Sequence, residues 1–78
     1  MKKIEELLKE IHAENDYSAS TDFIADGLLD SFDLMRLLTL LESEYGVRIA
    51  GTDLMPMNFT SITAIRKLLN SYGVDDDL

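Results

Sequence analysis

The chain has 78 residues, no cysteine and a formal net charge of −8, with 46% apolar and 28% charged residues. This composition indicates one small globular domain rather than a disordered chain, and it excludes disulfides and cysteine-based metal or nucleophilic sites. The acidic balance argues against nucleic-acid binding, and no apolar run approaches the roughly 20 residues that a membrane span requires. We therefore expect a cytoplasmic monomer whose protein partners carry basic docking patches.

The first predicted element is an amphipathic helix over residues 2–14. Its apolar residues follow the i, i+3, i+4, i+7 spacing of one helical face. These residues are Ile4, Leu7, Leu8 and Ile11. The only histidine, His12, comes directly after this stripe, and we expect its side chain to be exposed or partly packed rather than catalytic.

Residues 15–29 show no sustained period and are rich in small polar residues, which predicts a loop. A loop of this length is uncommon in so small a domain and is often functional. It also contains apolar residues that we expect to pack into the core and hold the loop in place. These residues are Phe23, Ile24, Leu28 and Leu29.

The strongest helical pattern covers residues 31–45 and follows the pair Asp30-Ser31. One face of this helix is apolar, and Gly46 is expected to terminate it because glycine adopts the left-handed conformation at low cost. The apolar face consists of Leu34, Leu37, Leu38, Leu41 and Tyr45. After it, Val47 and Ile49 indicate a short extended stretch.

The last third of the chain predicts one short helical turn and one longer helix. Thr52-Asp53 has the character of a cap for a turn running to Met55, and Ser61 or Thr60 is expected to cap a helix over 62–72. The acidic residues of 75–78 are expected to form a disordered tail. The fold class is therefore all-α: a small four-helix bundle, with three long helices and one short one, in a single domain over residues 1–74.

The loop before the second helix contains part of a calcium-loop pattern. Five residues occupy positions 1, 5, 6, 9 and 12 of such a loop, namely Asp22, Asp26, Gly27, Asp30 and Asp33. Position 3 is Ile24, which supplies no side-chain oxygen, and Asp33 is shorter than the usual glutamate. We therefore expect no metal site.

Ser31 has two interpretations. Serine before an apolar helix is an ordinary N-cap, and the dipeptide Asp30-Ser31 alone favours that role. A phosphodiester on the same hydroxyl would, however, lie at the positive end of the helix dipole with free N–H groups nearby. The residues by themselves leave both readings open.

Three ordered blocks resemble the acyl and peptidyl carrier protein family. Residues 27–35, Gly-Leu-Leu-Asp-Ser-Phe-Asp-Leu-Met, are similar to its phosphopantetheine attachment region, although the family usually has leucine where Phe32 stands. Residues 41–49 are similar to the end of its second helix, and residues 53–62 to its short third helix and the start of its last. The resemblance covers about half of the chain and implies the four-helix bundle reached independently above.

The resemblance implies a carrier that is not itself an enzyme. A phosphopantetheinyl transferase would attach 4'-phosphopantetheine from coenzyme A to Ser31, beside Asp30, and the arm would carry fatty-acyl, polyketide or aminoacyl thioesters between loading and downstream biosynthetic enzymes. The expected partner-docking residues are Phe32, Asp33, Met35, Arg36, Thr39 and Glu42. Arg36 departs from the acid common in fatty-acid carriers, which favours a specialised partner. The rival hypothesis is an unmodified acidic interaction module in which Ser31 is only a helix cap.

Overall fold

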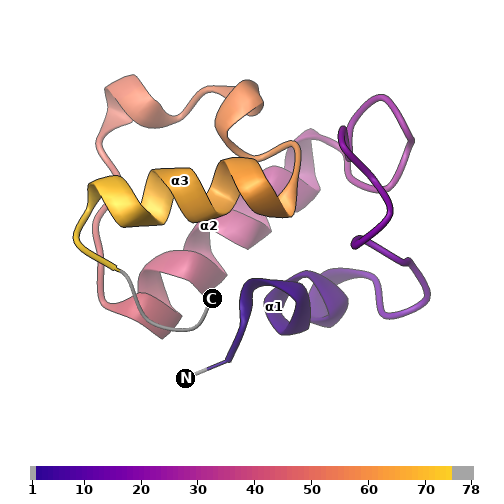
Figure 1. Cartoon of the computed structure of the whole chain (residues 1–78), viewed down its shortest axis with the longest axis horizontal. Helices are drawn as coiled ribbons and strands as arrows, with labels where there is room; N and C mark the ends of the chain where they lie inside the picture. The colour runs from indigo at the N-terminus through magenta and orange to yellow at the C-terminus, as the bar shows by residue number, and fades with distance from the viewer. Residues whose placement is uncertain (1, 75–78) are drawn as a thin grey trace.

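A computed structural model describes residues 2–74 as a helical chain (Figure 1). Its elements are α1 (Ile4–Ile11), α2 (Ser31–Tyr45), the 3-10 turns η1 (Gly51–Asp53) and η2 (Pro56–Asn58), and α3 (Ile62–Ser71). This part of the chain contains no strand, which confirms the all-α prediction. The predicted fourth, short helix is not confirmed, because two separate 3-10 turns stand in its place. The tail predicted over residues 75–78 lies outside the described residues.

The second helix begins and ends where the sequence predicts, whereas the first is shorter than expected. At Gly46 the backbone has φ +65°, the left-handed conformation that closes α2. The first helix was expected to reach residue 14 but ends at Ile11, because His12 turns to an extended conformation with φ −139° and ψ 96°. Figure 1 shows the chain leaving α1 there and running through the long loop to α2.

Pro56 explains why the segment between α2 and α3 forms turns rather than a helix. Proline has no N–H with which to donate to the carbonyl of Thr52, so helix starting there would be interrupted after one turn. The first turn instead begins at Gly51, after Ala50, so the predicted cap at Thr52-Asp53 is wrong. Pro56 opens the second turn, a position that its fixed φ favours.

The core draws on all three α-helices and on the two connecting segments. Helix α1 packs against both α2 and α3. The fully buried side chains include two loop aromatics, Tyr17 and Phe23, whose rings meet edge to face with centroids 5.3 Å apart. Ile24 was expected to pack inward but is 39% exposed. Leu28 and Leu29, which were also predicted to pack inward, do so.

Hydrogen bonds hold the last turns to α3. Ser61 is the N-cap of α3, and its hydroxyl accepts the N–H of Ala64 at 3.0 Å. The Tyr72 hydroxyl donates to the Asp53 carboxylate at 2.6 Å and accepts the N–H of Ala50 at 2.8 Å.

No helix within residues 2–74 combines the length and the apolar character needed to cross a membrane.

Candidate functional site

Ser31 is the first residue of α2 and is exposed. Its neighbour Asp30 fills the capping position: Asp30 Oδ1 accepts the N–H of Asp33 at 2.9 Å. In return, Asp33 Oδ2 accepts the N–H of Asp30 at 3.1 Å, which completes a capping box. The Ser31 hydroxyl makes no hydrogen bond to any of residues 2–74. Of the two interpretations of Ser31, the helix cap does not fit, because Asp30 holds that position.

The start of α2 retains free donors for an anion. The N–H groups of Ser31 and Phe32 have no backbone acceptor within residues 2–74. They belong to the first turn of a 15-residue helix, where the macrodipole favours negative charge. A phosphate ester on the Ser31 oxygen would lie against these groups. The local geometry thus suits a phosphodiester at Ser31.

Asp33 lies beneath this turn rather than on its surface. Its side chain is buried, and its Oδ2 lies 2.9 Å from His12 Nε2. Burial raises the pKa of Asp33, but the hydrogen bonds from the Asp30 N–H and from His12 outweigh that effect, so the net pKa lies below its usual value. An ionised carboxylate only accepts, so His12 Nε2 is the donor. This burial is at odds with the docking role expected of Asp33.

The sequence reasoning missed the pairing of His12 with Asp33. The role of Asp33 at the helix start could have been predicted, because Asp30 and Asp33 have the spacing of a capping box. The histidine is 21 residues away in the chain, and no periodic pattern joins the two positions. The side chain of His12 was predicted to be exposed or partly packed, and it is 38% exposed.

The outer face of α2 carries four of the five other expected docking residues. Phe32 is 82% exposed, and Met35, three residues later on the same helix, is 61% exposed. Two neighbouring apolar side chains with this much exposed surface are unusual. Arg36 and Thr39 are exposed on the same helix. Glu42 is half-buried, and its carboxylate accepts the N–H of Ile49 at 2.9 Å, so it holds the chain after α2 in place.

An apolar cavity of about 190 Å³ opens beside Ser31. Its walls come from the start of α2 on one side and from the segment around η2 on the other. It is lined by Ser31, Leu34, Met35, Leu38, Leu54, Met55, Pro56 and Phe59. A more open and more polar hollow, which includes His12 and Asp33, borders Ser31 as well. Ser31 therefore lies at the rim of a cavity that suits an apolar group attached nearby.

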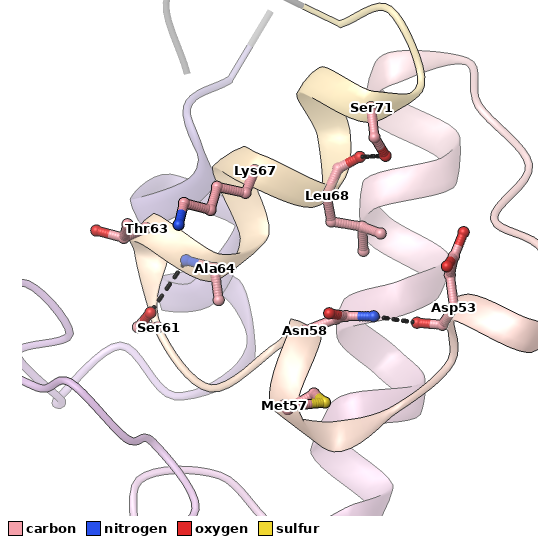
Figure 2. A pocket seen from close by; sticks show the side chains of 9 residues that line it. All are labelled: Asp53, Met57, Asn58, Ser61, Thr63, Ala64, Lys67, Leu68 and Ser71. Carbon is pink, nitrogen blue, oxygen red and sulfur yellow. Dashed lines mark hydrogen bonds between the residues drawn. The ribbon is translucent and has the colours of Figure 1, made fainter.

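A second hollow, between α3 and the 3-10 turns, offers no comparable chemistry (Figure 2). Four of its six polar side chains, those of Asp53, Asn58, Ser61 and Ser71, form hydrogen bonds within the fold, and the other two, Thr63 and Lys67, are exposed. Ser61 caps α3, the Asn58 amide donates to the carbonyl of Asp53 at 2.8 Å, and the Ser71 hydroxyl donates to the carbonyl of Leu68 at 2.6 Å. Figure 2 shows these groups paired along the walls.

The carboxylates of the rejected calcium-loop pattern stabilise the turns before α2. Asp22 Oδ1 accepts the N–H groups of Ile24 and Ala25 at 3.1 and 3.0 Å. Asp26 Oδ2 accepts the hydroxyl of Ser20 at 2.6 Å. Within residues 2–74 no three potential metal ligands gather around one point.

Comparison with known proteins adds a single family assignment. No curated protein and no solved structure matches the chain. A family model described as the phosphopantetheine attachment site matches residues 2–69, which is far more than half of the chain. The chain therefore belongs to the acyl carrier protein family, whose members bind 4'-phosphopantetheine covalently and act as carriers rather than as enzymes.

Proposed function

We propose that Ser31 is the residue to which 4'-phosphopantetheine is attached, and that the chain shuttles acyl or aminoacyl groups between biosynthetic enzymes. The observation that carries this proposal is the exposed, unpaired Ser31 hydroxyl on the first residue of α2. The adjacent Asp30 already caps the helix, so the hydroxyl is not needed for folding. A nucleophilic oxygen that is free and exposed is what a transferase requires.

The surrounding residues would hold the attached group. The N–H groups of Ser31 and Phe32 would face the phosphate, and Asp30 fixes the turn that presents them. When bound, the prosthetic group supplies a thiol that holds the cargo as a thioester. The apolar cavity beside Ser31 offers a place for an acyl chain.

Docking is proposed for the exposed part of α2, which we call the α2 face. It comprises Phe32, Met35, Arg36 and Thr39. Asp33 and Glu42 would support this face from inside, through their hydrogen bonds to backbone N–H groups. We further propose that the carrier unit spans residues 1–74 and works as a cytoplasmic monomer.

The rival hypothesis is an interaction module that is never modified. The exposed Phe32 and Met35 would serve that role equally well. In it, however, Ser31 was to act as the helix cap, and that position is held by Asp30. The attachment hypothesis is therefore the better supported of the two.

The test is modification of the apo protein by coenzyme A and a broad-specificity phosphopantetheinyl transferase. Intact mass should rise by one phosphopantetheinyl group, and peptide fragmentation should place it on Ser31. Ser31→Ala should abolish the mass increase. Ser43→Ala, which removes another exposed hydroxyl of α2, should leave it unchanged. A protein that stays unmodified both in vitro and in its native cell would favour the interaction module.

A further inference from the structure

Helix α2 contains three acidic residues, and none of them is fully exposed. Asp33 is buried, and Glu42 and Glu44 are half-buried and accept the N–H groups of Ile49 and Lys2, each at 2.9 Å. The exposed residues of α2 are Ser31, Phe32, Met35, Arg36, Thr39 and Ser43. Arg36 is therefore the only charged residue among the exposed residues of α2, although the exposed acid Asp30 directly precedes the helix.

The guanidinium of Arg36 has no counter-ion among residues 2–74: it makes no ion pair and no hydrogen bond there. Glu10 lines the same shallow hollow of about 270 Å³, but its carboxylate is paired with Lys2 Nζ at 2.9 Å. Arg36 follows Phe32 by four residues, so the two side chains are neighbours on one helical face, and Met35 lies beside them. The α2 face thus combines apolar side chains with an uncompensated cation.

Most of the net charge of −8 lies outside α2, whose three acids and one base sum to −2. Every exposed acid within residues 2–74 precedes Ser31, on α1 or in the loop. These residues are Glu6, Glu10, Glu14, Asp16, Asp26 and Asp30. The overall charge can steer a basic protein from a distance, but contact at the α2 face would place its cations against Arg36. Such like-charge contact disfavours the complex, whereas a carboxylate can bind a guanidinium through two parallel hydrogen bonds.

We infer that the α2 face selects a partner enzyme whose docking surface is apolar opposite Phe32 and Met35 and carries a carboxylate opposite Arg36. This inference rests on the proposed function, since the partner is the enzyme that reaches the arm on Ser31. The partner surface inferred here differs from the basic docking patches that the overall charge predicts. An enzyme that reaches the Ser31 hydroxyl must also face Phe32, and Arg36 is one turn further along the same face.

The test is a charge-reversal cycle on the rate of Ser31 modification. The probes are a phosphopantetheinyl transferase with a basic carrier-binding surface and a variant of it in which those basic residues are replaced by glutamate. Each probe is assayed with the wild-type chain, with Arg36→Glu, and with the matched control Arg66→Glu. Arg66 is an exposed base on α3, so both substitutions change the net charge equally.

Arg36→Glu should raise kcat/KM with the basic transferase by about fivefold and lower it with the reversed one by a similar factor, the size of a favourable exposed ion pair. These effects should shrink as salt is raised. Arg66→Glu should change both rates in the same small proportion. Equal rates for Arg36→Glu and Arg66→Glu with both probes would overturn the inference while leaving Ser31 modification, and hence the proposed function, intact. Absence of modification in every chain would instead contradict the proposed function.

Discussion

His12 Nε2 lies 2.9 Å from Asp33 Oδ2, so the residue that ends α1 holds a carboxylate in the first turn of α2. The same Oδ2 atom accepts the N–H of Asp30 at 3.1 Å. The contact therefore connects the end of one helix to the capping box of the next, directly beside Ser31. It joins the residue that directly follows α1 to the first turn of α2.

Asp33→Asn should destabilise the fold at neutral pH by about 2 kcal/mol, because it removes a charged acceptor from two hydrogen bonds. The pKa of Asp33 is lowered by folding, so its carboxylate stabilises the fold above the unfolded pKa, and that contribution is lost as the pH falls toward the folded value. The difference in unfolding free energy between the wild type and Asp33→Asn should therefore shrink below about pH 4. Urea unfolding at several pH values measures it.

The control for this experiment is Asp26→Asn, which makes the same change of charge at an exposed loop position. It should cost less than Asp33→Asn at neutral pH. A gap between wild type and Asp33→Asn that stays constant from neutral pH to pH 3 would contradict the assigned role of the ionised carboxylate.

Asp30→Ala and Ser31→Ala should have different effects on stability although the residues are adjacent. Asp30 provides the cap, so its loss should cost about 1 kcal/mol. Ser31 is exposed and its hydroxyl is not bonded within residues 2–74, so Ser31→Ala should stay within about 0.5 kcal/mol of the wild type. Thermal unfolding followed by circular dichroism compares them. A larger loss for Ser31→Ala would return the capping role to Ser31.

Gly27→Ala should destabilise the fold by about 1 kcal/mol through backbone strain alone. Gly27 has φ +74° in the turn before α2, and an added Cβ would meet nothing within 4 Å. The matched control is Gly51→Ala, where a Cβ also meets open space but φ is not positive, so the change should be near neutral. Equilibrium unfolding of both variants measures this. Equal costs would show that positive φ is not the cause.

Calcium should bind without a tight, saturable site. Asp22 and Asp26 already accept hydrogen bonds that stabilise the loop, and Ile24 stands where a ligand would be needed. Millimolar calcium should still raise the melting temperature slightly, because cations screen the repulsion among carboxylates. Calorimetric titration is the measurement. One micromolar site that disappears in Asp26→Ala would contradict this prediction.

The local features of the fold were readable from the sequence, and the distant pairings were not. The limits of α2 follow from Asp30 and Gly46, whose effects act within one turn. Helix α1 ends where His12 turns to contact Asp33, a residue that only the folded chain brings near it. Burial of Tyr17 was not predicted for a similar reason: its hydroxyl donates to the carbonyl of His12 at 3.1 Å, inside a loop without a period.

In the candidate site, too, local features could be predicted from the sequence and distant contacts could not. Ser31 and the exposed positions of Phe32 and Arg36 follow from helical periodicity and from the resemblance of the segment around Ser31. Which acids of α2 point inward could not be read from spacing, because Asp33 and Glu42 are held by backbone N–H groups of other segments or of the cap. Those hydrogen bonds decide the charge that a partner meets.

The cavity beside Ser31 has one stiff wall and one compliant wall. Helix α2 is anchored through the buried Leu37 and Leu41, whereas Leu54 and Met55 lie between two single 3-10 turns and are 42% and 51% exposed. Each of these turns is closed by two backbone hydrogen bonds, but neither Leu54 nor Met55 belongs to the core, so moving these two side chains outward disturbs little of it. A bulkier group in the cavity would therefore be accommodated by outward movement of Leu54 and Met55, on the side away from α2. The attachment point would keep its position while the volume next to it changes.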